Sequence, residues 1–163
     1  MTIAESYASE LQQEAVATRK VLERVPDDRL SWKPHAKSMS FIELASHVAT
    51  ILEWGQVTIE NDQFVMDEDY KPWRAGSSRE LVERFEQGLA AAMEALQGRS
   101  DDEWAKPWSL KKGDAVLFTM PKSAIMRAFV LNHLVHHRGQ LSVYLRLNDI
   151  PVPAIYGPSA DES

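Results

Sequence analysis

Three of the chain's five histidines, His133, His136 and His137, lie within five residues of one another in an apolar, helix-like segment. Imidazole titrates near neutral pH and is the commonest metal ligand in proteins. A histidine cluster inside a buried helix costs free energy unless its nitrogens find partners. A bound metal ion is the simplest partner. The spacing alone is equally compatible with a partly exposed cluster that binds no metal.

The periodicity of a helix selects which histidines act together. His133 and His137 are four residues apart and share one helix face. His136 cannot lie on the same stripe as both, so a third ligand should come from another helix. His47, in the middle of a second apolar segment, is the candidate, although such a residue can also be a hydrogen-bonded core histidine. His35 lies in a proline-flanked loop, where we expect it to be exposed.

Three imidazoles make a site of a particular kind. Closed structural zinc sites usually have four protein ligands, whereas three leave one position for water or substrate. A metal with three neutral ligands keeps its full charge, which lowers the pKa of a water or thiol and polarises carbonyls. The chain has no cysteine, so a reacting thiol must come from outside. Imidazole suits zinc, nickel and iron, and affinity alone does not select among them.

Residues near the histidines admit two readings each. Gly139 costs about 1 kcal/mol relative to alanine inside a helix, so it either permits a close approach or is a tolerated defect. Arg138 either holds a partner near the site or is a surface or salt-bridged residue. Glu14 is a conceivable fourth, carboxylate ligand or a solvated side chain. Trp54 follows His47 by seven residues and either lines a pocket or belongs to the core. The same alternatives hold for Met126, Val130 and Tyr144.

Apolar residues at helical spacing predict four long helices. They are expected over residues 3–23, 40–60, 77–98 and 121–148. Three Ser-x-x-Glu capping boxes support the helix starts. These boxes are Ser40 with Glu43, Ser77 with Glu80, and Ser100 with Glu103, the last beginning one short turn.

The remaining segments are expected to be irregular or short. Residues 61–76 are polar and aromatic and predict a loop that shapes a pocket mouth. Residues 108–118 predict a small hairpin turning at Lys112-Gly113. Three prolines after Ile150 exclude a helix, and the apolar residues of this tail suggest that it packs on the bundle. The expected fold is an all-α four-helix bundle with a small hairpin before the last helix and an extended C-terminal tail, in one domain over residues 1–163.

Composition and charge limit the classes of partner that we expect this chain to bind. The net charge of −6 over 163 residues argues against a nucleic-acid-binding face, which needs a basic patch. No apolar stretch is long enough to span a bilayer, and the polar, acidic N-terminus does not resemble a signal peptide. We therefore expect no nucleic acid, no membrane association and a cytoplasmic location.

Four segments carry a resemblance to a known family: residues 31–40, 44–47, 132–141 and 152–162. The His-His-Arg-Gly-Gln-Leu block and the Tyr-Gly-Pro-Ser tail are the most specific parts. On these residues the sequence resembles the DinB-like (DinB/YfiT) family of metalloenzymes. The resemblance covers most of the chain.

The resemblance implies an up-down-down-up four-helix bundle that is often dimeric. It also implies a divalent metal held by one histidine from the second helix and two from the last. Here these are His47, His133 and His137, which leaves His136 in a supporting role. Relatives include S-transferases and isomerases that use low-molecular-weight thiols, and metal-dependent hydrolases.

The resulting expectation is a metal-dependent S-transferase or hydrolase that acts on a small molecule, as a homodimer and with an external thiol where one is used. One alternative is a non-catalytic metal- or ligand-binding stress-response protein. Another is that the histidines bind no metal and only form hydrogen bonds within the core.

Overall fold

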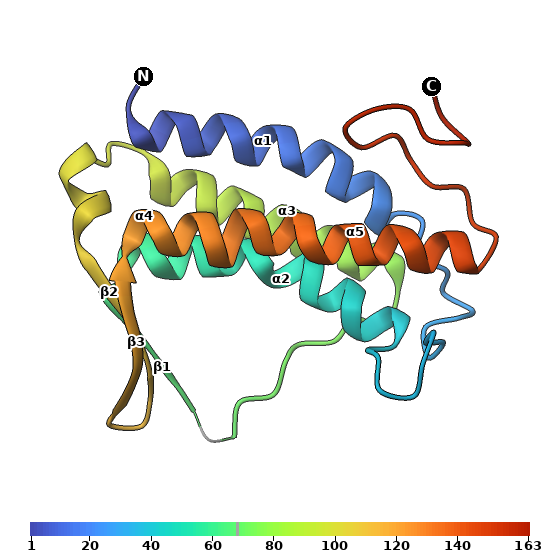
Figure 1. Cartoon of the computed structure of the whole chain (residues 1–163), viewed down its shortest axis with the longest axis horizontal. Coiled ribbons are helices and arrows are strands. Elements are labelled where there is room, and N and C mark those ends of the chain that lie inside the picture. The colour runs from blue at the N-terminus through green and yellow to red at the C-terminus, as the bar shows by residue number, and fades with distance from the viewer. Residues whose placement is uncertain (68) are drawn as a thin grey trace.

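The computed structural model describes residues 1–67 and 69–163. Glu68, in the segment predicted to be a loop, lies outside the described residues. Four long helical stretches run side by side (Figure 1). They are α1 (Ile3–Leu22), α2 (Phe41–Glu60), α3 (Ser78–Leu96) and a last stretch made of α4 (Lys122–Ile125), a π-helical segment (Met126–Leu131) and α5 (Asn132–Leu147). α1 and the last stretch run one way and α2 and α3 the other, which is the up-down-down-up order that the resemblance implies.

The helix starts follow the predicted caps to different degrees. Ser40 and Glu43 form both hydrogen bonds of a capping box at the start of α2. The Ser77 side chain accepts from the Glu80 amide, but the Glu80 carboxylate accepts from the residue before the cap. Ser100 precedes a short 3₁₀ helix (Asp101–Ala105) without a side-chain cap bond. The short turn is therefore confirmed, whereas its capping box is wrong.

A three-stranded sheet extends from one end of the helices (Figure 1). Its strands are β1 (Gln63–Met66), β2 (Pro107–Lys112) and β3 (Ala115–Pro121), in the order β1-β2-β3. β2 and β3 form the predicted antiparallel hairpin, which turns through Gly113 at a φ of +54°. Glycine adopts this left-handed conformation without steric cost.

The third strand corrects the expected all-α class. β1 lies within residues 61–76, which were predicted to be a loop, and it pairs in parallel with β2. Its four residues are too few for a clear alternating pattern, and its partner strand comes about 40 residues later in the chain. The helical bundle is thus confirmed, but it carries a small sheet.

The core is built around α2. Its buried apolar side chains contact those of α3 and α5, and these in turn contact α1 in the same cluster. They include Phe41, Leu44, Val48, Ile51 and Leu52, each no more than 1% exposed. Full burial of such a side chain contributes about 1.5–3 kcal/mol. This packing fixes the orientation of α2 and so of the face that carries His47.

The C-terminal tail packs on the bundle, as predicted. Ile150, Val152 and Ile155 contact the core without forming a helix. Among the described residues, no helix is long and apolar enough to cross a membrane. The assignment of residues 1–163 to one domain stays a prediction.

Candidate metal centre

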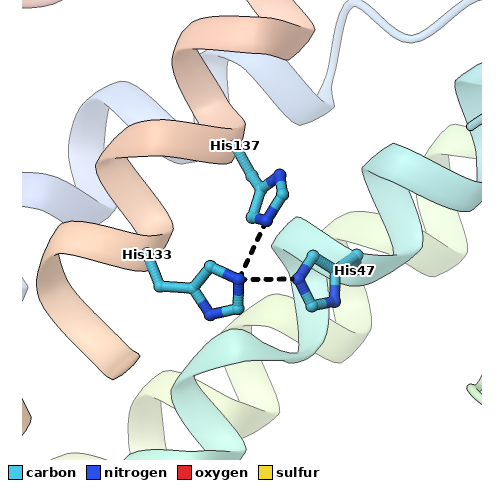
Figure 2. A group of neighbouring side chains, drawn as sticks. All are labelled: His47, His133 and His137. Atoms are coloured by element: carbon cyan, nitrogen blue, oxygen red, sulfur yellow. Dashed lines mark hydrogen bonds between the residues drawn. The ribbon is translucent and has the colours of Figure 1, made fainter. Parts of the chain in front are cut away.

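α2 and α5 bring His47, His133 and His137 together (Figure 2). The Nε2 atom of His133 lies 3.1 Å from Nε2 of His47 and 2.8 Å from Nε2 of His137. One ligand atom from each residue lies within 4.8 Å of the others, and all three side chains are partly buried. The structure thus brings together the histidines that helical spacing and the family resemblance selected.

Hydrogen bonds fix the orientation of the two α5 imidazoles. The Nδ1 atom of His133 is 3.3 Å from the backbone oxygen of Phe129. Because a carbonyl only accepts, this Nδ1 carries the proton and leaves Nε2 with its lone pair. The Nδ1 atom of His137 donates in the same way to Oε1 of Gln140, at 2.8 Å. Such bonds select the ring nitrogen that is free to bind a metal.

This arrangement fits a divalent cation. Two lone pairs that face each other across 2.8 Å repel, and a cation between them removes the repulsion. Nitrogens bound tetrahedrally to one zinc ion at 2.0–2.1 Å lie about 3.3–3.4 Å apart. The separations of 3.1 Å and 2.8 Å between the Nε2 atoms are shorter by a few tenths of an ångström, so a small outward shift of the rings makes room for the ion. The group can therefore hold a metal through three Nε2 atoms.

Burial keeps the three imidazoles in the neutral form that binds metal. Burial, and then the neighbouring His137 and His133, lower the pKa of His47 to about 4. Burial also lowers the pKa values of His133 and His137 below the usual value. At neutral pH a metal thus displaces few protons from these nitrogens.

A π-helical segment immediately precedes the α5 histidines. The Asn132 amide bonds the Arg127 carbonyl, five residues back, where an α-helix would use the fourth. The segment contains Phe129, whose carbonyl orients His133. Such segments are frequent at functional sites. The sequence predicted one uninterrupted helix over residues 121–148, and apolar periodicity does not reveal this change of hydrogen bonding.

His136 lies beside the centre but outside the group that can hold a metal. Its side chain is exposed, and its ring centroid is 4.7 Å from that of His137. His35 is exposed in its loop, as predicted. A Cβ atom at Gly139 would meet no heavy atom within 4 Å, so of the two readings of Gly139 the close approach is wrong.

Arg138 points away from the centre, into a buried polar cluster. Its guanidinium is 1% exposed and lies 2.7 Å from the Glu14 carboxylate. It also donates to Thr18 Oγ1 at 3.1 Å and to the Tyr156 hydroxyl at 2.6 Å. The salt-bridged reading of Arg138 is confirmed. Both readings of Glu14 are wrong, because its side chain is buried and paired with Arg138 rather than solvated or part of the metal group.

Three hollows border the histidines. The first, of about 310 Å³, lies over His47 and is also lined by Trp54 and by described residues of the 61–76 segment. The second, of about 430 Å³, lies beside His137 and Tyr144. The third, of about 240 Å³, touches His47 and His133 and lies against the sheet. Trp54 therefore lines a pocket, as does Tyr144, whereas Met126 and Val130 are fully buried core residues.

The chain matches the DinB family over residues 1–163. The uncharacterized protein YrdA of Bacillus subtilis (strain 168) is 27% identical over 151 residues, which cover 91% of this chain and 85% of YrdA. This identity extends across nearly the whole bundle.

Solved structures share the fold. A DinB-like protein from Bacillus cereus ATCC 10987 superposes with a TM-score of 0.70 at 22% identity, over 93% of this chain and 97% of that one. A DinB-like protein of Bacillus subtilis, YjoA, gives a TM-score of 0.70 at 19% identity, over 94% and 99% of the two chains. Since the family match extends over residues 1–163, the chain belongs to the DinB family.

Proposed function

We propose that this protein is a metal-dependent enzyme of the S-transferase or hydrolase type, with His47, His133 and His137 as its metal ligands. One observation carries the proposal: three Nε2 atoms converge, with that of His133 lying 3.1 Å from that of His47 and 2.8 Å from that of His137. A cluster that served only the core would pair a donor with each acceptor. In His133 and His137, the Nδ1 atoms on the far side of each ring from the centre already have their hydrogen-bond acceptors.

A divalent metal in this site would lower the pKa of a water or an external thiol, so that a nucleophile forms at neutral pH. The chain's own residues supply position and access. Gln140 and the Phe129 carbonyl hold two imidazoles in the metal-binding tautomer. The three hollows give a small molecule access to His47, His133 and His137 from several sides.

The choice between transfer and hydrolysis depends on what supplies the nucleophile. The chain contains no cysteine, so a thiol would be a low-molecular-weight co-substrate. Zinc, nickel and iron are all compatible with three imidazoles. The divalent metal, the use of a thiol and the homodimer are parts of this proposal that follow from the family resemblance.

The test combines metal analysis with turnover. The purified chain is measured by mass spectrometry for bound metal, then chelated and reloaded with zinc, nickel or iron. Each form is assayed for conjugation of 1-chloro-2,4-dinitrobenzene with a low-molecular-weight thiol, and for hydrolysis of 4-nitrophenyl acetate. We expect turnover to disappear on chelation and to return with one of the metals. Equal rates before and after chelation would contradict the proposal.

A further inference from the structure

The hollow between the histidines and the sheet differs from the other two in its lining. Apart from His47 and His133, its walls are apolar: Trp54, Met66, Trp108, Leu110, Phe118, Ile125 and Phe129. None of these described residues carries a charge. We call this hollow the apolar chamber.

The walls of the apolar chamber are aromatic and fixed by packing. Phe118 of β3 and Phe129 of the π-helical segment stack with centroids 5.2 Å apart and planes 14° apart. Trp54 of α2 packs edge-on against Phe64 of β1 at 4.9 Å. Trp108 of β2 is 1% exposed. The sheet and the bundle thus build a preformed space, and its rings favour stacked or edge-on contact with another aromatic ring.

Charged groups lie around the other two hollows. Glu43 and Arg74 line the one over His47 and pair with each other at 2.5 Å. Lys37 and the uncharged, polar Gln140 line the one beside His137. An unpaired charge placed among apolar walls costs far more free energy than one placed among such partners. The charged parts of a substrate or thiol therefore fit these hollows and not the apolar chamber.

The volume of the apolar chamber sets the size of its occupant. At about 240 Å³ it exceeds the roughly 150 Å³ of an apolar protein cavity that accepts benzene. A single aromatic ring with a substituent of a few atoms fills it. Because His47 and His133 form part of its wall, such a substituent reaches the three-histidine group.

We propose that the apolar chamber binds an uncharged, single-ring aromatic part of the substrate and directs its reactive substituent to the three histidines. This inference rests on the proposed function, whose substrate class it names. It assigns a role to the sheet, which forms one wall of the chamber through Trp108, Leu110 and Phe118.

Two probes of equal size and different charge test the inference. 4-Methylacetophenone is neutral, whereas 4-methylbenzoate carries a carboxylate on the same ring. Binding to the full-length chain is measured by ligand-detected NMR after chelation, so that the carboxylate gains no affinity from a metal. We expect the neutral probe to bind at least about ten-fold more tightly, because burying an unpaired charge is costly. Equal affinities would overturn the proposal.

Filling the chamber provides the second arm of the test. Ile125→Trp and Leu110→Trp each place a large side chain in its wall and should weaken binding of 4-methylacetophenone more than ten-fold. Leu110 is only partly buried, so its variant retains the fold if Ile125→Trp does not. Leu147→Trp, at a 57% exposed position of α5 away from the chamber, is the matched control and should bind as the wild type does. Unchanged binding in Leu110→Trp would overturn the assignment of the site.

The outcome separates this inference from the proposed function. Discrimination between the probes without any bound metal in the purified chain would support the chamber and contradict the metalloenzyme. Metal-dependent turnover without discrimination between the two probes would support the metalloenzyme and contradict the role of the apolar chamber.

Discussion

His137 and Arg138 are neighbours on α5, yet they belong to two clusters of opposite character. The Arg138 guanidinium meets a carboxylate, two hydroxyls and a backbone carbonyl within 3.1 Å, so its charge and its donors are satisfied. His137 meets three other imidazoles, those of His47, His133 and His136, and it forms no salt bridge within the part of the chain that the structure describes. A buried polar cluster that satisfies itself supports the fold. A cluster of like groups with facing lone pairs is completed only by something added.

The strongest test of this difference between the two clusters is to remove the imidazole of His133. His133 contacts both other histidines, so His133→Ala should weaken metal binding by more than about 100-fold, the upper range for loss of a supporting partner. The metal-free variant should fold, because the change removes a desolvated base. Metal content and thermal unfolding after chelation measure the two effects. Full metal occupancy in this variant would refute the ligand assignment.

Removal of the Arg138 charge should lower the stability of the fold and leave metal binding unchanged, the reverse of what we expect for His133→Ala. Arg138→Met leaves the Glu14 carboxylate buried without its cationic partner and should lower the free energy of unfolding by about 3–5 kcal/mol. Metal stoichiometry should not change. Arg146→Met is the matched control on the same helix, because Arg146 pairs with Asp161 at the surface and such pairs contribute about 0–1 kcal/mol. Urea denaturation compares the two variants, and equal losses would remove the distinction between the clusters.

The sequence predicted the group of three histidines but not the cluster around Arg138. Helical periodicity placed His133 and His137 on one face, and the need for a third ligand from another helix made His47 the candidate, in agreement with the resemblance. The Arg138 cluster depends on Tyr156 of the irregular tail returning to Glu14 on α1, and no local pattern reports such a contact. β1 was missed for the same reason, because its partner strand is distant in the chain. Local periodicity gives helices and their faces, whereas tertiary contacts decide what lies opposite each face.

The hydrogen bond from His137 to Gln140 allows a finer test. Gln140→Leu removes the acceptor that holds Nδ1–H and should weaken metal binding by about 10–100-fold. Stability should change little, because Gln140 is exposed. Gln140→Glu keeps an acceptor and should restore affinity. Metal titration of the chelated variants measures the effect, and equal affinities for leucine and glutamate would show that the bond orients nothing.

Acid should destabilise the metal-free protein through the protonation of His47. Burial, and then the neighbouring His137 and His133, lower the pKa of His47 from its ordinary value of 6.5 to about 4 in the folded chain. Between about pH 6.5 and 4 the His47 imidazole is protonated in the unfolded state but stays neutral in the folded state. The free energy of unfolding therefore decreases as the pH falls through this range. The melting temperature of the chelated protein should decrease over this range. His47→Gln should flatten the decrease, and a slope identical to that of the wild type would contradict the assigned burial effect.

The smallest effect is expected at His136. It is exposed, and it contacts the centre only through the ring of His137 at 4.7 Å. His136→Gln should therefore change metal affinity less than about two-fold, far below the effect of losing a residue that supports a ligand. Metal titration beside His133→Ala gives the comparison directly. A loss at His136 as large as that at His133 would mean that the metal lies along α5 and that His47 only covers it.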